Sequence, residues 1–296
     1  MSVIRTTTGE KVFQIFNYIF LILLSLTFLV PFLVVLSTSF VSEAESMRRG
    51  AFILIPQELD LTAYKMLLSR GSILFNAYKI TVFRVAVGTF LNLTFTSMLA
   101  YGLSKRNLPG RNFFITLIFI TMLFGGGLIP TYMLIKGLGL VDSIWVMIIP
   151  GLISAWNTII MRNFFYTIPD SLEESATLDG ATPFQILIKI IFPVSLPAFV
   201  TIGLFYAVGH WNAWFDAAIY INDRSKMPVQ VIMRNIVLTM TTQDVNNEFI
   251  SDFGVRPPAQ TLKSAVIIVS TIPILCIYPF LQKHFVKGVM IGSIKG

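Results

Sequence analysis

The segment SLEESATLDGATPFQILIKIIFPVSLP, residues 171–197, contains acidic residues and helix end signals inside a very apolar chain. Asp170 or Ser171 can cap a helix here, and Ser171 and Glu174 have the S-x-x-E spacing of a capping box. Gly180 then predicts a helix stop, because glycine readily adopts the left-handed conformation that follows many helices. A short polar helix is therefore predicted between residues 170 and 180.

A second helix is predicted directly after this glycine. Thr182 can cap it, Pro183 suits its first position, and Gln185 lies where a capping box places an amide or a carboxylate. Pro193 and Pro197 follow at the entrance to the next apolar run. The segment is thus predicted to fold as a helix, a glycine elbow and a second helix that leads into a membrane span.

The rest of the chain has the composition of a membrane protein. Of its 296 residues, 55% are hydrophobic and 12% are charged, which lies outside the range of a soluble domain. A membrane helix needs ~20 mostly apolar residues, and the charge-poor runs predict six such spans. The predicted spans cover residues 13–41, 76–104, 112–136, 143–165, 193–221 and 263–284. We therefore predict an all-α polytopic membrane protein, with residues 1–296 forming a single transmembrane domain.

Basic residues in the short hydrophilic segments predict the side of the membrane on which each loop lies. The link at residues 104–112 and the C-terminal tail carry cations and no acid, and the N-terminus adds two more cations. These residues are Lys105, Arg106, Arg111, Lys283, Lys287, Lys295, Arg5 and Lys11. Under the positive-inside rule, both termini and the loop at residues 166–192 are predicted to be cytoplasmic. The loops at residues 42–75 and 222–262 are then predicted to lie outside.

Two interpretations of the predicted cytoplasmic helix remain open at this point. It can be an ordinary solvated loop helix, or it can dock on another protein through the small residues Ser175 and Ala176. The signals within the loop do not decide between these interpretations.

The loop sequence EESATLDGATPFQILIKIIFPVSLP, residues 173–197, closely resembles the cytoplasmic EAA loop of permease subunits of binding-protein-dependent ABC importers. Four further stretches resemble the carbohydrate branch of this family, the MalG-like and LplC-like permeases. They are AYGLSKRNLPGRN at 100–112, MRNFFYTIPDSLEESA at 161–176, WNAWFDA at 211–217 and LQKHFVKGVMIGSIKG at 281–296. The resemblance covers most of residues 12–296, and its strongest departure is Ser175, where alanine is usual.

The resemblance implies a type I ABC importer permease fold with a coupling helix that sits in a groove on an ATPase subunit. The implied ATPase-coupling residues are Glu173, Glu174, Ser175, Ala176, Leu178, Asp179, Gly180 and Ala181. Glu174 matches the acid that meets the nucleotide-binding subunit, and Gly180 matches the elbow. Ala176 and Leu178 are implied to be packing contacts. The tail at residues 283–296 is likewise implied to reach toward the ATPase dimer.

The resemblance also implies a function and a set of partners. The chain would be a permease subunit of an ATP-driven importer in the bacterial cell membrane, taking up a carbohydrate. Within that class an oligosaccharide is expected, including uronate-containing fragments of polysaccharides. A homologous second permease would complete a heterodimer, two copies of an ABC ATPase would hold ATP and Mg, and an extracytoplasmic sugar-binding protein would deliver the substrate. The alternatives are an ABC importer permease for a non-sugar solute and a secondary transporter.

Polar, aromatic and glycine residues within the predicted spans are candidates for the substrate path. They are Arg84, Asn92, Gly126, His210, Trp211, Asn212, Trp214 and Asp216. Arg84 can line the path for an anionic sugar, or it can snorkel or form a structural ion pair, since an intramembrane cation costs ~2.5–3.5 kcal/mol on insertion scales. FGGGLIP at residues 124–130 can line the path or mark a kink or helix end. GHWNAWFDA at residues 209–217 can stack on sugar rings or form an interfacial aromatic belt.

Several other classes of function lack the residues that they need. The sequence has no G-x-x-x-x-G-K-[ST] motif, so an ATP site of this kind is not predicted on this chain. A metal site is not predicted, because the potential soft ligands are few and scattered: His210, His284 and Cys276. Nucleic-acid binding is not predicted either, because the sequence shows no pattern of basic and aromatic residues that would form a groove. A secondary transporter needs an ion-coupling acid within the spans, and essentially Asp216 alone stands near that position.

Overall fold

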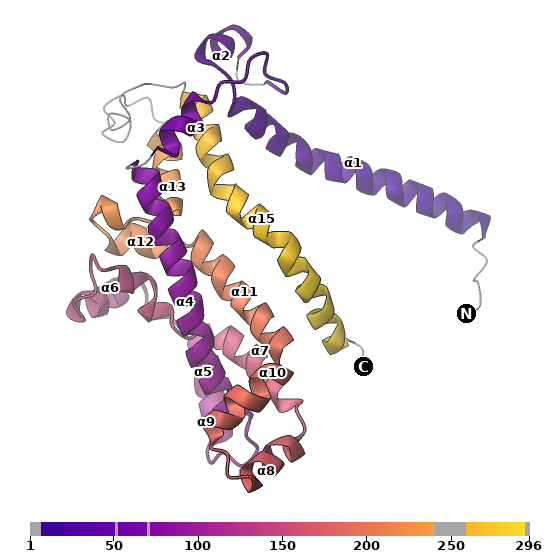
Figure 1. Cartoon of the computed structure of the whole chain (residues 1–296), viewed down its shortest axis with the longest axis vertical. Coiled ribbons are helices and arrows are strands. Elements are labelled where there is room, and N and C mark those ends of the chain that lie inside the picture. Colours follow the sequence, from indigo (N-terminus) through magenta and orange to yellow (C-terminus); the bar gives the residue numbers. More distant parts are fainter. Residues whose placement is uncertain (1–6, 51–52, 70–71, 240–258, 294–296) are drawn as a thin grey trace. The chain divides into compact units, whose positions relative to one another are not determined.

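The computed structural model describes residues 7–50, 53–69, 72–239 and 259–293, and every regular element within these ranges is helical (Figure 1). The chain divides into two compact units. One comprises Met1–Ser72 and Asn235–Thr271, and the other comprises Ile73–Arg234 and Ile272–Gly296. Of the predicted outer loop at residues 222–262, residues 240–258 lie outside the described ranges.

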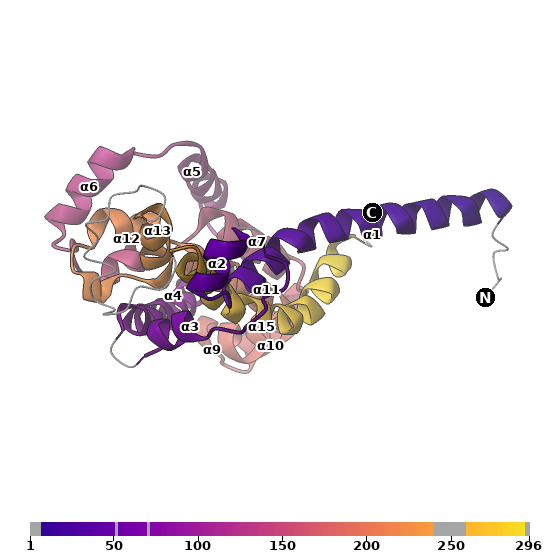
Figure 2. The ribbon, with the colours of Figure 1, turned by 90° about the horizontal axis from the view of Figure 1, so that it is seen from above.

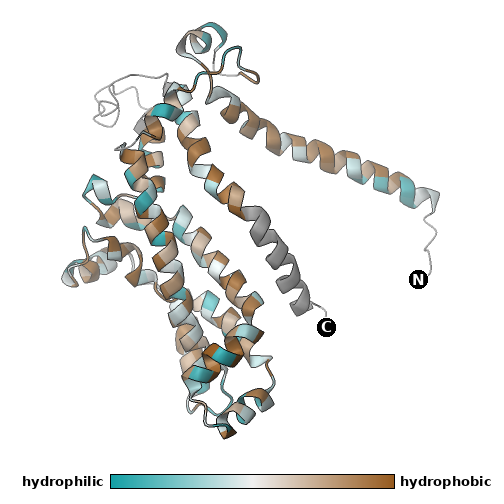
Figure 3. Cartoon of the chain, in the orientation of Figure 1, coloured by the Kyte–Doolittle hydropathy of each residue, from teal (hydrophilic) through white to brown (hydrophobic). Residues whose placement is uncertain are grey.

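The first unit is dominated by one long apolar helix. Its helices are α1 (Thr8–Thr38), α2 (Glu43–Arg49), α3 (Thr62–Leu67) and parts of α13 (Val229–Thr239) and α15 (Ala259–Ser293). α1 begins with a capping box, in which the Thr7 N–H donates to the Glu10 carboxylate at 2.7 Å and the Glu10 N–H donates to the Thr7 hydroxyl at 3.4 Å. Most residues of α1 are hydrophobic (Figure 3). Their side chains are exposed, as a membrane span requires.

The second unit packs around α4. Its helices are α4 (Ile73–Ser104), α5 (Arg111–Leu123), α6 (Leu128–Gly137), η1 (Ile144–Met147), η2 (Ile149–Gly151), α7 (Ala155–Tyr166), α8 (Asp170–Leu178), α9 (Pro183–Ile186), η3 (Leu187–Ile191), α10 (Phe192–Val194), α11 (Leu196–Asn212), α12 (Phe215–Tyr220), η4 (Arg224–Lys226) and the remaining parts of α13 and α15. α4 packs against α7 and α11, and one buried cluster takes Ala100, Met161 and Ile202 from these three helices. This core holds both ends of the loop that follows α7.

The predicted spans appear as three uninterrupted helices and three bent helix pairs. α1, α4 and the Gln260–Ile277 part of α15 are each long and apolar enough to cross a membrane. The bent pairs join α5 with α6 at 113°, η1–η2 with α7 at 49°, and α9–α10 with α11 at 90°. The structure thus has three candidate spans, or six when each bent pair is counted as one span.

Two of these bends occur at residues that oppose a continuous helix. Between α5 and α6, Phe124 is extended and Gly127 has a φ of +83°, a conformation that favours glycine (Figure 2 shows α6 turning away from α5). Between α10 and α11, Pro193 and Pro197 flank Ser195. The predicted interruption at residues 124–130 is therefore confirmed as a helix break.

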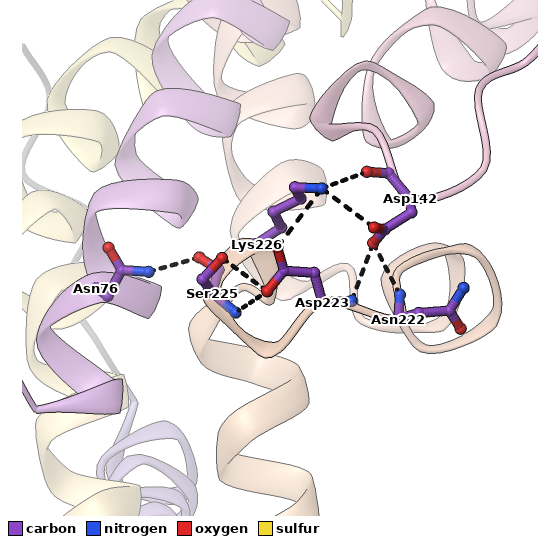
Figure 4. Close-up of polar contacts among 6 residues, drawn as sticks. All are labelled: Asn76, Asp142, Asn222, Asp223, Ser225 and Lys226. Carbon is purple, nitrogen blue, oxygen red and sulfur yellow. Dashed lines mark hydrogen bonds and ion pairs between the residues drawn. The ribbon is translucent and has the colours of Figure 1, made fainter.

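A polar cluster, called the loop cluster below, joins Asn76 on α4 to residues in two turns of the second unit (Figure 4). It consists of Asn76, Asp142, Asn222, Asp223, Ser225 and Lys226. The Asp142 carboxylate accepts the backbone N–H groups of Asn222 at 3.0 Å and Asp223 at 2.9 Å, and Lys226 Nζ donates to Asp142 Oδ2 at 3.1 Å. The backbone N–H of Asp223 is the main reason that the pKa of Asp142 lies below its ordinary value.

Candidate functional site

The helix α8 lies in the connection between α7 and α9, where the sequence predicts a capped polar helix. It begins at Asp170, with Pro169 in the extended conformation before it, and no side chain caps its first turn. The prediction that Ser171 and Glu174 form a capping box is therefore wrong, because Pro169 occupies the N-cap. The helix starts two residues too early for Ser171 to cap it and one residue too early for Asp170. Asp170 and Glu173 instead place negative charge in the first turn, where the helix dipole favours it.

The end of α8 matches the predicted glycine elbow. Gly180 has a φ of +82°, its N–H donates to the Thr177 carbonyl at 3.0 Å, and the Ala181 N–H donates to the Ala176 carbonyl at 3.0 Å. This pair of bonds is a Schellman motif, which requires a residue in the left-handed conformation. A side chain at position 180 would strain the backbone although nothing described lies within 4 Å of the site of its Cβ.

The second helix of the loop begins with the predicted capping box. The Thr182 N–H donates to Gln185 Oε1 at 2.8 Å, and the Gln185 N–H donates to the Thr182 hydroxyl at 3.4 Å. Pro183 occupies the first helical position, where its missing N–H costs no hydrogen bond. Both ends of the turn between α8 and α9 are therefore fixed by local hydrogen bonds.

One face of α8 binds the chain's own core. Ala176 is buried in the cluster formed with α4, α7 and α11, and the Glu173 carboxylate accepts from the Tyr101 hydroxyl at 3.0 Å. Glu173 also forms an ion pair with Lys105, whose ammonium lies 3.7 Å from the centre of the Tyr101 ring. Burial lowers the pKa of Lys105 to about 8, whereas the charge of Asp170 favours its protonated form.

The opposite face of α8, called its outer face below, is exposed and consists of Glu174, Ser175, Leu178 and Asp179. The Leu178 side chain is 90% exposed, and among the described residues Glu174 has no hydrogen-bond or ion-pair partner. Glu174 and Leu178 also line a groove of about 870 Å³ between α8 and the link after α4. An exposed leucine beside an unpaired acid, on a helix fixed at both ends, is suited to contact another protein.

Four of the predicted path residues form a polar network that is largely buried and joins α4, α11 and α12. Arg84 on α4 forms an ion pair with Asp216 on α12 through its Nη1 and Nη2 atoms, and Nη1 also donates to the Ala213 carbonyl at 3.3 Å. Arg84 Nε lies 3.4 Å from Nδ1 of His210 on α11. Because a guanidinium only donates, Nδ1 accepts this bond, and the histidine is then neutral with its proton on Nε2.

Asn92 extends the network toward η2. His210 Nε2 lies 2.6 Å from Asn92 Oδ1, and the Asn92 amide donates to the carbonyls of Gly151 at 2.8 Å and Leu152 at 2.7 Å. Gly88 makes room for the imidazole, since a Cβ at this position would lie 2.5 Å from His210 Nε2. Arg84 thus has all its described partners within the chain, which favours the structural-pair interpretation of this residue.

The remaining predicted path residues are not brought into this network. Trp211 is buried and lies 6.3 Å from the ring of Tyr78, whereas Trp214 lies 4.0 Å from the Arg234 guanidinium. Asn212 and Gly126 are exposed, Gly126 within the break between α5 and α6. The predicted role of these residues in a substrate path stays a prediction.

Sequence reasoning did not identify several residues that complete these sites. Tyr101 and Lys105 anchor α8, and Gly88 and the Gly151 carbonyl complete the polar network. The spacing between these partners carries no periodic signal, because the contacts join residues that are tens of positions apart. Among the residues that the structure describes, no group of three His, Cys, Asp or Glu side chains is placed to hold a metal ion.

Comparison with known proteins identifies the family to which these helices belong. Residues 108–291 match the family described as "Binding-protein-dependent transport system inner membrane component". The chain belongs to this family. It is the multi-pass inner membrane component of an ABC transporter complex and has no ATPase activity of its own.

Individual relatives match over nearly their whole length. The permease protein YtcP of Bacillus subtilis (strain 168), named for a polygalacturonan/rhamnogalacturonan transport system, is 44% identical over 287 residues, which cover 97% of this chain and 99% of YtcP. The protein LplC of the same strain is 42% identical over 292 residues, or 99% of this chain and 98% of LplC.

The solved structures also contain a similar chain. It belongs to a bacterial ABC transporter involved in the import of the acidic polysaccharide alginate. The solved chain is 33% identical to the present protein and superposes with a TM-score of 0.87. The match covers 96% of the present protein and 100% of the solved chain. The predicted family and the all-α permease fold are confirmed.

Proposed function

We propose that this chain is one permease subunit of an ATP-driven importer and that α8 is the helix through which ATP hydrolysis drives it. The observation that supports this proposal is that α8 has one face packed on the chain's own core and one exposed face. Glu173 and Ala176 attach one face to the chain's own core, while Glu174 and Leu178 remain exposed on the other. A force applied to the outer face is therefore passed directly to α4 and α7.

The proposal includes the orientation of the chain. α8 and the cationic link at residues 104–112 lie at the same end of the second unit, where Lys105 pairs with Glu173. The positive-inside rule supports a cytoplasmic position for this end, together with both termini. The loops at residues 42–75 and 222–262 then face outward, where we place the docking surface of an extracytoplasmic binding protein.

The proposed assembly contains a homologous second permease and two copies of an ATPase, which carry the ATP and Mg. Each permease places one coupling helix on one ATPase subunit. Closure of the ATPase dimer brings the two coupling helices together and opens the pore to the outside, and hydrolysis resets it. This is a rigid-body switch between two states, and it uses α8 as a lever because both of its ends are fixed.

We propose a carbohydrate as the substrate, in the form of an oligosaccharide that contains uronic acids. Support comes from two relatives, of which one is named for polygalacturonan and rhamnogalacturonan transport and the other belongs to an importer of the acidic polysaccharide alginate. Arg84 does not supply a free positive charge for such a substrate, because Asp216 neutralises it. Recognition of the acid groups is therefore assigned to the binding protein or to other path residues.

ATP hydrolysis by the purified complex in lipid tests this proposal, with binding protein loaded from a panel of neutral and uronate-containing oligosaccharides. Substrate-dependent stimulation is expected in the wild type and should be lost in Gly180→Val and Glu174→Lys. Gly137→Val is the matched control, because the site of its Cβ is also open but its φ is not positive. Normal stimulation in both α8 variants would contradict the coupling role. Uptake without ATP would instead support a secondary transporter.

A further inference from the structure

We propose that three arginines around Tyr166 form a binding site for the phosphate of an anionic membrane phospholipid. The arginine cluster consists of Arg106 in the link after α4, Arg111 at the start of α5, and Arg162 on α7. Their guanidinium carbons lie 5.0, 5.0 and 5.1 Å from the centre of the Tyr166 ring. Three cations share a single aromatic ring.

Hydrogen bonds hold two members of the cluster in place before any ligand binds. Arg111 Nε donates to the Leu103 carbonyl at 3.3 Å, and Arg162 Nε donates to the same carbonyl at 3.4 Å. Arg162 also donates to the Asn163 side chain at 2.8 Å. Nε is engaged in both cases, so the Nη1 and Nη2 edges of Arg111 remain for an anion. A planar pair of N–H groups suits a phosphate oxygen pair.

The cluster carries more positive charge than the chain neutralises. Asp170 lies 3.5 Å from Arg106, and both side chains are more than half exposed, which makes this a weak surface pair. Within the described part of the chain, Arg111 and Arg162 have no carboxylate at ion-pair distance. All three guanidinium groups lie within about one Debye length of each other at ~0.1 M salt. An anion bound between them would relieve this repulsion.

The position of the cluster identifies the kind of anion. Arg111 is the first residue of α5, Tyr166 is the last residue of α7, and the Leu103 carbonyl lies one residue before the end of α4. Three candidate membrane segments therefore end here, so the cluster lies at headgroup depth whichever side of the membrane it occupies. The inference does not depend on the proposed orientation or on the substrate.

Apolar surface directly beside the arginines fits acyl chains. Phe113 and Phe114 follow Arg111 on α5 and are 66% and 46% exposed, and α5 has no buried residue. A phosphate on the guanidinium groups with acyl chains along α5 is the arrangement expected of a bound lipid. An acidic protein surface would match the charges, but it would leave the aromatic start of α5 without a partner.

Lipid binding to the purified transporter complex tests the inference without transport or ATP. The complex is stripped of lipid in a neutral detergent and titrated with phosphatidylglycerol or, separately, with phosphatidylcholine, and bound lipids are counted by native mass spectrometry. The double variant Arg111→Gln/Arg162→Gln should bind its tightest phosphatidylglycerol about 25-fold more weakly, at roughly fivefold for each charge removed. Phosphatidylcholine binding should not change.

Lys79→Gln is the matched control. It removes one cation that lies 4.9 Å from an aromatic ring at the opposite end of α4, and its lipid binding should equal that of the wild type. Unchanged phosphatidylglycerol binding in the double variant, or an equal loss in Lys79→Gln, would overturn the inference. Loss of the ATPase subunit with lipid binding intact would assign the cluster to an acidic protein surface. If the double variant does not assemble, Arg106→Gln replaces it, and no weakening there would also overturn the inference.

Discussion

The outer face of α8 and the polar network around Arg84 use charged side chains in opposite ways. In the network, Arg84 is 2% exposed, and its charge is met by Asp216 while its remaining donors reach His210 and the Ala213 carbonyl. On α8, Glu174 lies exposed and unpaired among the described residues. A buried charge whose partners all lie within the chain destabilises the fold when one partner is removed, whereas an exposed charge on an anchored helix is available to a partner.

This contrast assigns different consequences to substitutions in the two regions. Changes in the network should lower stability, and transport should fall only because less complex assembles. Changes on the outer face of α8 should leave stability unchanged and uncouple ATP hydrolysis from transport.

The largest effect is expected at Arg84. Arg84→Met leaves the Asp216 carboxylate without its cation. It should destabilise the complex by about 3 kcal/mol, the low end of the range for a broken buried pair, because the Asp216 side chain is 29% exposed. The double variant Arg84→Met/Asp216→Asn should recover much of this loss, because neither charge remains. Thermal unfolding of the complex in detergent measures both. Equal stability of the single variant and the wild type would contradict a structural role for the pair.

The next largest effect is expected at Gly88. A methyl group there would lie 2.5 Å from the His210 ring, so Gly88→Ala must displace the imidazole and should cost about 1–3 kcal/mol. Gly209→Ala, on the facing helix and with open space around its Cβ, is the control and should be nearly neutral. Unfolding of the two variants should therefore differ by several degrees, and identical curves would show that the network does not hold His210 in place.

Adjacent glutamates on α8 provide the sharpest test of the two faces. Glu173→Gln weakens the bonds to Tyr101 and Lys105 and should cost about 1.5 kcal/mol of stability. Glu174→Gln should leave the melting temperature unchanged and reduce substrate-stimulated ATP hydrolysis. The reverse pattern, with Glu174 needed for stability, would show that the faces are assigned the wrong way round.

Thr182 and Ser171 test which helix of the loop is capped by a side chain. Thr182→Ala removes the cap of α9 and should cost about 1 kcal/mol, measured by unfolding of the complex. Ser171→Ala should cost only a few tenths of this amount, because Ser171 lies inside α8 and caps no helix. A larger loss at Ser171 than at Thr182 would restore the capping box that the sequence predicted.

The smallest effect is expected in the loop cluster, where exposed charges depend on pH. Because the pKa of Asp142 is depressed in the fold, its contribution is complete above the ordinary value of 3.8 and is lost as the pH falls through the lower folded value. Asp142→Asn removes this charge but tolerates the φ of +59°, so it should reduce stability slightly at neutral pH and not at strongly acidic pH. Asp142→Ala should show the same pH-dependent loss and, in addition, a loss at every pH from backbone strain. A pH-independent effect of Asp142→Asn on unfolding would contradict this account.

Local signals explain how much of the fold could be predicted. Gly180, Thr182 and Gln185 act through bonds to residues at most a few positions away, and Pro183 acts through its fixed φ at the first helical position. Their spacing therefore predicted the elbow and the second cap correctly. The predicted cap of α8 is wrong because the helix begins at Asp170 with Pro169 at the N-cap. The sequence does not decide among adjacent start positions.

Long-range contacts explain what the sequence could not predict. Arg84 and Asp216 are each visible as unusual residues within apolar runs, but nothing in the sequence shows that they face each other across two helices. The same is true of Gly88, which is needed only because His210 lies against it. The inner face of α8 was also not foreseen, since Ala176 was assigned to an ATPase contact by resemblance alone and the structure buries it against the chain itself.

Cross-linking from the outer face of α8 tests the central claim most directly. The complex carries Leu178→Cys in a Cys276→Ser background, and a maleimide benzophenone attached at position 178 is activated by light. Leu61→Cys, an exposed leucine in the loop predicted to face outward, is the matched control. The account predicts a covalent adduct with the ATPase subunit from position 178 and none from position 61. No ATPase adduct from position 178 would contradict the assignment of α8 as the coupling helix.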